Sequence, residues 1–224
     1  MNDELLIHWP YLLGALAMLW FPRQWLRNGA RLFKRRRRSE SALEKLTGRG
    51  ARDPDDKSVH LGKEFTTFRN YIDLFRGLAG GYGLSTFAFT ATGPDAATTL
   101  LLIQGGVLLV AGFIQAVRFD GGRLSYFAPI FWFVGLSAGF PAHYTGLFSF
   151  ILVLAINPAI PNPRLFLTAY GMILLGLGLV FGAPSMPNAM AAGLVLLVPL
   201  ASLLSKRPVV IFSRKPRATA GVSG

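Results

Sequence analysis

Histidine is the side chain whose chemistry this sequence could use most readily, because a neutral imidazole binds metals and haem-type cofactors. Two of the three histidines, His8 and His143, fall at the ends of apolar segments. Two such imidazoles are suitable axial ligands for a haem or a chlorin, so His8 and His143 are the candidate cofactor ligands. Isolated histidines near a membrane face more commonly form interfacial hydrogen bonds. The favoured interpretation is therefore that the protein holds no cofactor.

Asp73 and Arg76 form the second candidate group. They are three residues apart, so they share one face of a helix. An ionisable pair deep in a membrane would mark a functional site. Asn70 and Tyr71 place this pair near the start of an apolar segment, however, where we interpret it as a structural ion pair. The middle of every apolar segment lacks Asp, Glu, Lys and Arg, which disfavours a proton- or sodium-coupled carrier.

Catalytic and metal-binding motifs are not evident in the sequence. The chain contains no cysteine, which excludes disulfides, thiolate metal sites and a cysteine nucleophile. Gly80, Gly81 and Gly83 do not form a nucleotide-binding loop, because no strand precedes them. We also find no Ser/His/Asp signature. The sequence predicts no catalytic residue and no metal site, and it favours a protein that is not an enzyme.

Glycines spaced four residues apart recur in three apolar segments. Small residues at this spacing allow two helix backbones to approach closely, which favours helix packing in membranes. We expect these glycines to pack helices within the chain, with docking of another membrane protein as the alternative. The pairs are Gly77 and Gly81, Gly135 and Gly139, and Gly178 and Gly182.

The residues discussed so far lie in or beside segments that we expect to span a membrane. The chain has 224 residues, of which 52% are hydrophobic and only 15% are charged, whereas soluble domains carry about 25% charged residues. The fold class predicted is all-α, a polytopic transmembrane helical bundle of about seven spans. The fourth and fifth spans are short and flanked by prolines, and could instead form one re-entrant hairpin. The expected spans cover residues 5–21, 71–92, 98–117, 124–140, 142–156, 165–182 and 189–204.

A run of five basic residues follows the first span and sets the expected orientation. Basic residues beside spans stay in the cytoplasm, so the N-terminus is placed outside and the C-terminus inside. With seven spans, all 23 Lys and Arg residues are then cytoplasmic. The only charged residues expected on the outer face are Asp3, Glu4 and Asp95. An acidic start followed by basic residues is the reverse of a signal peptide, so the first span is expected to be retained. The basic run consists of Lys34, Arg35, Arg36, Arg37 and Arg38.

The segment that carries this run is expected to lie on the membrane surface. Residues 23–38 alternate apolar and basic positions at helical spacing, which is typical of an amphipathic helix in the headgroup layer. Lys34 to Arg38 would contact anionic lipid there, so the net charge of +12 is not interpreted as nucleic-acid binding. The chain thus divides into a first span (1–22), a basic interfacial helix and linker (23–70), a six-span bundle (71–204) and a basic cytoplasmic tail (205–224), expected to be disordered.

These patterns favour one function over two alternatives. The favoured hypothesis is a noncatalytic structural or accessory subunit, in the bacterial cytoplasmic membrane, that packs against other membrane proteins. The alternatives are a small-solute or lipid transporter built around the fourth to sixth spans, and a cofactor carrier using His8 and His143. An aromatic cluster is expected to face lipid or a partner; it comprises Tyr126, Phe127, Phe131, Trp132, Phe133 and Phe140.

Overall fold

The computed structural model describes residues 4–22, 65–120, 123–140, 143–160, 162–207 and 209–210. Most of these residues are helical, and they form seven α-helices. The helices are α1 (Trp9–Trp20), α5 (Phe68–Tyr82), α6 (Pro94–Ala116), α7 (Ile130–Gly139), α8 (His143–Ile156), α9 (Pro163–Val180) and α10 (Ser185–Leu204). A π-helical turn, η1 (Gly83–Phe87), continues α5, and a 3-10 turn, η2 (Asn157–Ala159), follows α8.

The described residues also include five short strands, which the expectation of an all-α bundle did not contain. Strands β1 (Glu4–Ile7) and β2 (Phe89–Thr92) pair antiparallel. Strands β3 (Val117–Asp120) and β4 (Arg123–Phe127) form an antiparallel hairpin, and β5 (Val209–Val210) adds to β4 in parallel. The ends of the first and second expected spans are therefore extended and not helical. The reason is that a short apolar run can pair with another strand as well as coil, and periodicity alone does not separate the two.

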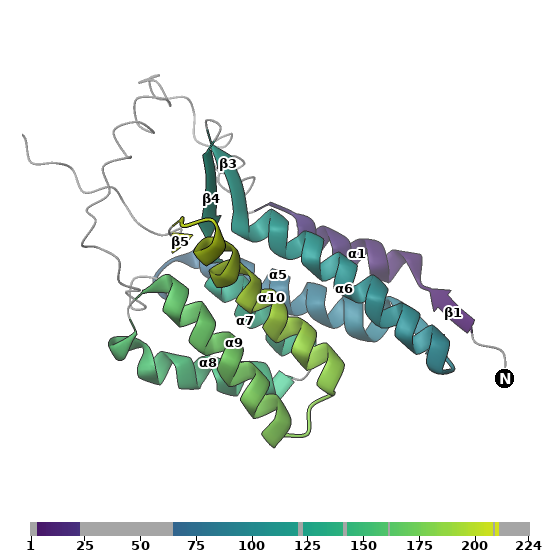
Figure 1. Cartoon of the computed structure of the whole chain (residues 1–224). Coiled ribbons are helices and arrows are strands. Elements are labelled where there is room, and N and C mark those ends of the chain that lie inside the picture. Colours follow the sequence, from purple (N-terminus) through teal and green to yellow (C-terminus); the bar gives the residue numbers. More distant parts are fainter. Residues whose placement is uncertain are drawn as a thin grey trace, which may run out of the picture.

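Helix α7 lies at the centre of the bundle. Helices α5, α8 and α10 all pack against it. Figure 1 shows α1, α5 and α6 on one side of the bundle and α8, α9 and α10 on the other. All ten residues of α7 are buried, as expected for a helix that is apolar on every face.

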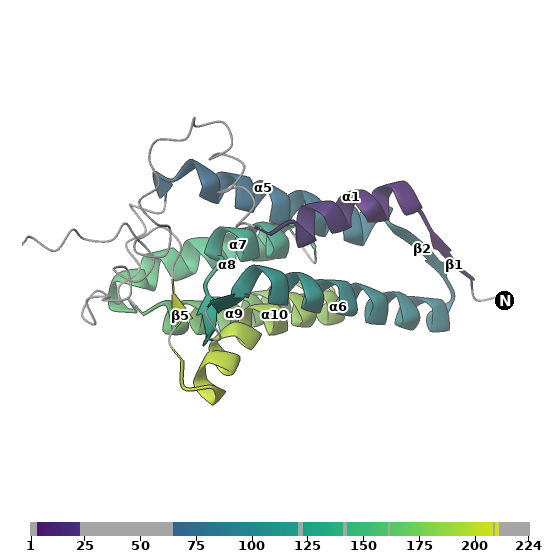
Figure 2. The same cartoon turned by 90° about the horizontal axis from the view of Figure 1, so that it is seen from above.

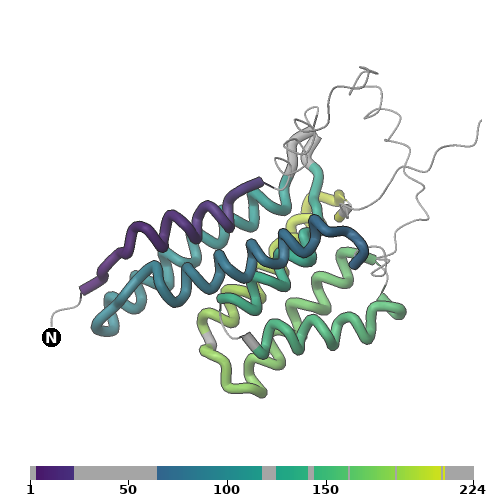
Figure 3. The backbone as a smooth tube through the Cα atoms, turned by 180° about the vertical axis from the view of Figure 1, so that it is seen from behind, coloured from purple at the N-terminus to yellow at the C-terminus, as the bar shows by residue number. Residues whose placement is uncertain are grey.

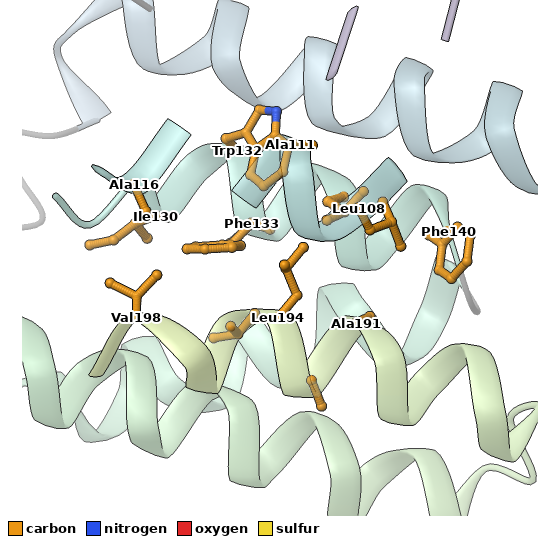
Figure 4. Packing of buried hydrophobic residues seen from close by; sticks show 14 of the residues in the cluster. Leu108, Ala111, Ala116, Ile130, Trp132, Phe133, Phe140, Ala191, Leu194 and Val198 are labelled. Carbon is orange, nitrogen blue, oxygen red and sulfur yellow. The ribbon is translucent and has the colours of Figure 1, made fainter. Parts of the chain in front are cut away.

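The core corrects the expectation for the aromatic cluster. Trp132 and Phe133 are fully buried, and Tyr126, Phe131 and Phe140 are nearly so. Figure 4 shows Trp132 and Phe133 amid the core, with Leu108 of α6 and Leu194 of α10 around them. The prediction that these aromatic rings face lipid or a partner was wrong for all five, because other elements enclose α7 and the residues on either side of it.

The two sheets mark opposite ends of the bundle. Strand β1 lies at one end and β3 to β5 at the other in Figure 1, and Figure 2 shows β2 beside β1. We call these the β1–β2 end and the β3–β5 end. From α5 to α10 the chain runs back and forth between them, a path that can be followed along the tube in Figure 3. Helices α5 and α7 are consequently parallel to each other, two passes apart.

Within the part of the chain that the structure describes, three helices are long and apolar enough to cross a membrane, which indicates a membrane protein. They are α6, α9 and the part of α10 from Met186 onward. Only 22% of the most apolar stretch of α6 is buried in the protein. Most of the apolar surface of this helix therefore needs a nonaqueous environment. Helices α1, α7 and α8 are apolar but shorter. At about 1.5 Å per residue, the ten residues of α7 are too short to cross a bilayer by themselves.

Candidate functional site

The Asp73–Arg76 pair lies in the interior of the protein. The side chains are 2% and 6% exposed, and Arg76 Nη1 donates to Asp73 Oδ1 at 3.1 Å. Arg76 Nη2 also donates to the carbonyl oxygen of Phe21, just after α1, and the guanidinium stacks over the Phe21 ring at 5.5 Å. One arginine thus joins α5 to the end of α1, with its charge balanced by Asp73.

Gln115 completes this arrangement from α6. Its Nε2 donates to the carbonyl oxygens of Leu19 and Phe21, at 2.9 Å each. The last carbonyls of a helix have no partner within the helix, and here Arg76 and Gln115 supply one. The resulting α1 end cluster, made of Asp73, Arg76, Gln115 and Phe21, ties three helices together and leaves no net charge among its side chains.

The glycines of α5 and α7 face one another. A Cβ atom added to Gly135 would lie 2.0 Å from the Leu74 carbonyl oxygen, and one added to Gly139 would lie 2.2 Å from that of Leu78. From the other side, a Cβ on Gly77 would lie 2.3 Å from the Trp132 carbonyl oxygen. Gly81 makes a similar but looser approach to α7. Two of the expected glycine pairs therefore form a single backbone-to-backbone contact inside the bundle.

The two glycines of the third pair, Gly178 and Gly182, have different structural roles. Gly178 of α9 lies against Asn188 of α10, whose Nδ2 atom would be 1.9 Å from an added Cβ. Gly182 has a φ of +64° and nothing within 4 Å of an added Cβ. It follows the end of α9, where a left-handed residue ends the helix. Gly182 is thus a turn residue and not the packing residue we expected.

The two candidate cofactor ligands stand on helices that do not pack together. His8 precedes α1, and its Nε2 is 3.0 Å from the Thr90 hydroxyl. His143 begins α8, and its side chain lies outside the described part of the structure. Helix α1 packs on α5 and α6, whereas α8 packs on α7 and α9. Among the described residues, no group of three or more His, Cys, Asp or Glu side chains could hold a metal ion.

The basic run and its expected interfacial helix fall outside the described residues. This applies to Lys34, Arg35, Arg36, Arg37 and Arg38, to the whole segment 23–64, and to the tail from residue 211. The predicted lipid contact of the basic run therefore stays a prediction.

Buried amides in the bundle donate to the backbone of neighbouring helices. Gln104 of α6 donates from Nε2 to the Leu84 carbonyl oxygen in η1 at 3.1 Å. Asn188 of α10 donates to the Leu174 carbonyl oxygen in α9 at 3.2 Å. These side chains, like Gln115, use their hydrogen bonds to join helices.

A pocket of about 480 Å³ lies near the β1–β2 end and was not expected from the sequence. Four elements line it: η1 with Ser85 and Thr86, α6 with Ala97 and Gln104, the end of α7 with Phe140, and the start of α10. No sequence pattern could have revealed it, because the lining residues are spread over about a hundred positions and meet only when the helices pack.

Arg164 is a further structural residue that the sequence did not single out. Its Nε and Nη2 atoms donate to the Ser202 hydroxyl at 3.1 and 2.8 Å, and Nη2 also donates to the Arg207 carbonyl oxygen at 3.1 Å. These bonds join the start of α9 to the end of α10 at the β3–β5 end. An arginine just after the prolines that separate two apolar segments was the available signal.

Comparisons with protein-family models, curated proteins and solved structures find no match to this chain.

Proposed function

We propose that this chain is an integral membrane protein that passes through the bilayer seven times, the shorter helices together with the residues that flank them, with the β1–β2 end outside and the β3–β5 end in the cytoplasm. In this proposal it acts as a noncatalytic structural or accessory subunit of a larger assembly in a bacterial cytoplasmic membrane. The basic run Lys34 to Arg38 would contact anionic lipid at the cytoplasmic face.

The distribution of charge along the described elements supports this threading. Arg118 and Arg123 belong to the β3–β4 hairpin, and Arg164 is bonded to the Arg207 backbone near β5. Glu4 in β1 and Asp95 in the first turn of α6 belong to the opposite end. Basic residues remain on the cytoplasmic side of membranes, so the β3–β5 end fits the cytoplasm.

The functional proposal depends mainly on one observation: the buried polar side chains form hydrogen bonds that join one segment of the bundle to another. Arg76, Gln104, Gln115 and Asn188 come from four positions in the bundle, and each donates to a backbone carbonyl of another segment. Enzymes and coupled carriers bring such groups together around a substrate or an ion. Here they hold helices in place, which suits a scaffold.

The outer surface supports association with other membrane proteins through apolar side chains and not through glycine. Four of the expected packing glycines already lie in the contact between α5 and α7, namely Gly77, Gly81, Gly135 and Gly139. Large apolar residues instead project from α6 and from the end of α9, where Leu102 is 74% exposed and Leu179 is 80% exposed. Lipid or a partner helix can cover such a surface.

Extraction with native lipid tests the proposal. The tagged protein, isolated from its own membrane in polymer-bounded lipid discs, should have a mass greater than one chain and contain a second membrane protein at a fixed ratio. The matched control is an unrelated tagged membrane protein, which should not retain that second protein. A particle with a single copy of the chain and no fixed partner would contradict an accessory role.

A further inference from the structure

The pocket near the β1–β2 end has the size and construction of a small-molecule site. Its volume is about 480 Å³, within the range of about 300–1,000 Å³ that is usual for such sites. Its floor is buried, with Gln104 4% and Phe140 5% exposed. Tyr82, Thr86 and Ala97 form an exposed rim. The pocket is open to the surface, so a ligand could enter from there and rest on the buried floor.

The pocket is bordered by a break in regular helix geometry. Residues Gly83–Phe87 form a π-helical turn, η1, after α5. Such turns occur frequently at functional sites, because the extra residue displaces side chains and carbonyls from their regular positions. Gln104 occupies the position opposite this turn and donates to the Leu84 carbonyl oxygen. The amide is thus held in place by the same irregular turn that shapes the pocket wall.

The lining has polar groups but no charge. Apolar side chains, including Leu100, Leu101 and Phe140, make up most of it. The polar groups are hydroxyls, such as those of Ser85 and Thr86, and the Gln104 amide. Moving an ion from water into such surroundings is costly without a charged partner. The lining therefore favours a neutral ligand over a carboxylate, a phosphate or an amine.

The hydrogen-bonding capacity of the lining specifies the polar part of that ligand. The bond from Gln104 Nε2 to Leu84 orients the amide, and its carbonyl oxygen makes no hydrogen bond to any other residue that the structure describes. A carbonyl oxygen accepts hydrogen bonds and cannot donate them. A hydroxyl group on the ligand can donate to it.

We propose that this pocket binds a neutral amphipathic molecule that carries a hydroxyl group, with the hydroxyl at Gln104 and the apolar part against Leu100, Leu101 and Phe140. This inference goes beyond the accessory role and does not depend on it. The molecule could be a membrane-resident lipid alcohol or a smaller alcohol from the aqueous phase, since both offer the same chemistry.

Photocrosslinking with three probes of equal chain length tests the charge requirement. The probes are a long-chain alcohol, the matching carboxylate and the matching amine, each with a diazirine at the chain end, added to the full-length protein in lipid discs. The alcohol should label peptides from η1, the start of α6 and the end of α7, and unlabelled alcohol should compete. Equal labelling by all three probes, or labelling spread over α6 and α9 without competition, would overturn the proposal.

Two matched variants test the location. Ala97→Phe places a ring in the rim, whereas Thr99→Phe places one on the same helix outside the pocket, and both positions are exposed. We expect Ala97→Phe to reduce specific labelling about tenfold, equivalent to about 1.4 kcal/mol, and Thr99→Phe to leave it unchanged. Equal labelling in the two variants would refute the site. Circular dichroism and elution volume establish that both variants fold.

Competition against the alcohol probe shows whether the ligand comes from the membrane or from the aqueous phase. If the site takes a membrane-resident alcohol, the long-chain alcohol should displace the probe and hexanol should not, even in large excess. Displacement by hexanol would identify a water-soluble alcohol as the ligand class. Failure of both alcohols to displace the probe would count against the site itself.

Discussion

At the scale of single residues, Arg76 shows how a charge is accommodated in the apolar interior. Its guanidinium bonds to the Asp73 carboxylate and to the Phe21 carbonyl, and it stacks on the Phe21 ring. A buried ion pair adds little net stability compared with an apolar pair, but removal of one partner leaves the other charge buried. Arg76 is therefore indispensable mainly because Asp73 is present.

Replacement of Arg76 should accordingly cost more than replacement of both partners. We expect Arg76→Leu to lower the free energy of unfolding by about 3–5 kcal/mol, and the double variant Asp73→Leu/Arg76→Leu to recover part of that loss. Denaturant unfolding in detergent micelles, followed by circular dichroism, measures both. Arg69→Leu, at an exposed position about two turns earlier in α5, is the control and should change stability by less than about 0.5 kcal/mol.

A result in which Arg69→Leu and Arg76→Leu destabilise equally would contradict this role for Arg76. The pair itself could be expected from the sequence, since a spacing of three residues places Asp73 and Arg76 on one helix face. The partners Phe21 and Gln115 could not, because they lie in segments that meet α5 only after the chain folds.

At the scale of elements, the contact between α5 and α7 depends on the absence of side chains. The two backbones approach so closely at Gly77, Gly135 and Gly139 that an added Cβ would overlap a carbonyl oxygen on the facing helix. Close approach of this kind gives van der Waals contact along the helices, which is a main source of helix association in lipid. It also places α7 deep in the bundle.

Alanine should therefore be tolerated at some glycines and not at others. Gly135→Ala should destabilise the protein by about 3 kcal/mol, the upper part of the range for overpacking, because the obstructing atom is Leu74 backbone. Gly176→Ala in α9, with nothing within 4 Å of the new Cβ, should be neutral or stabilising by up to about 1 kcal/mol. Thermal unfolding of the two variants in the same detergent distinguishes them, and a similar loss in both would refute the α5–α7 contact.

The helices could be predicted from the sequence, whereas only some of the strands could. Long apolar segments such as those of α6, α9 and α10 leave few alternatives to a helix. Strand β1 pairs with β2, more than eighty residues away, so no local pattern indicates the pairing. The β3–β4 hairpin could have been recognised, because Gly121 and Gly122 separate two short alternating runs. The expected spans 98–117 and 124–140 instead leave only residues 118–123 to connect two helices.

The site was less predictable than the fold. The pocket depends on where η1, α6, α7 and α10 end relative to one another, and that is decided by packing. The prediction that Trp132 and Phe133 lie on the surface was wrong for a related reason. Apolar residues face lipid or the core, and in a membrane protein composition alone does not separate the two.

At the scale of the whole molecule, the protein is a bundle with two chemically different ends. Acidic Glu4 and Asp95 belong to one end, and the basic hairpin, Arg164 and Lys206 belong to the other. This asymmetry is the basis for proposing that the bundle crosses a membrane in one direction.

Thiol labelling tests the orientation most directly, because the chain has no cysteine of its own. Asp95→Cys and Lys206→Cys each introduce one thiol at an exposed position, at opposite ends of the bundle. With a membrane-impermeant maleimide on intact cells whose outer membrane has been permeabilised, Asp95→Cys should be labelled at once. Lys206→Cys should react only after the inner membrane is opened. Labelling of Lys206→Cys in intact cells, or protection of Asp95→Cys, would contradict the seven-span arrangement with the N-terminus outside.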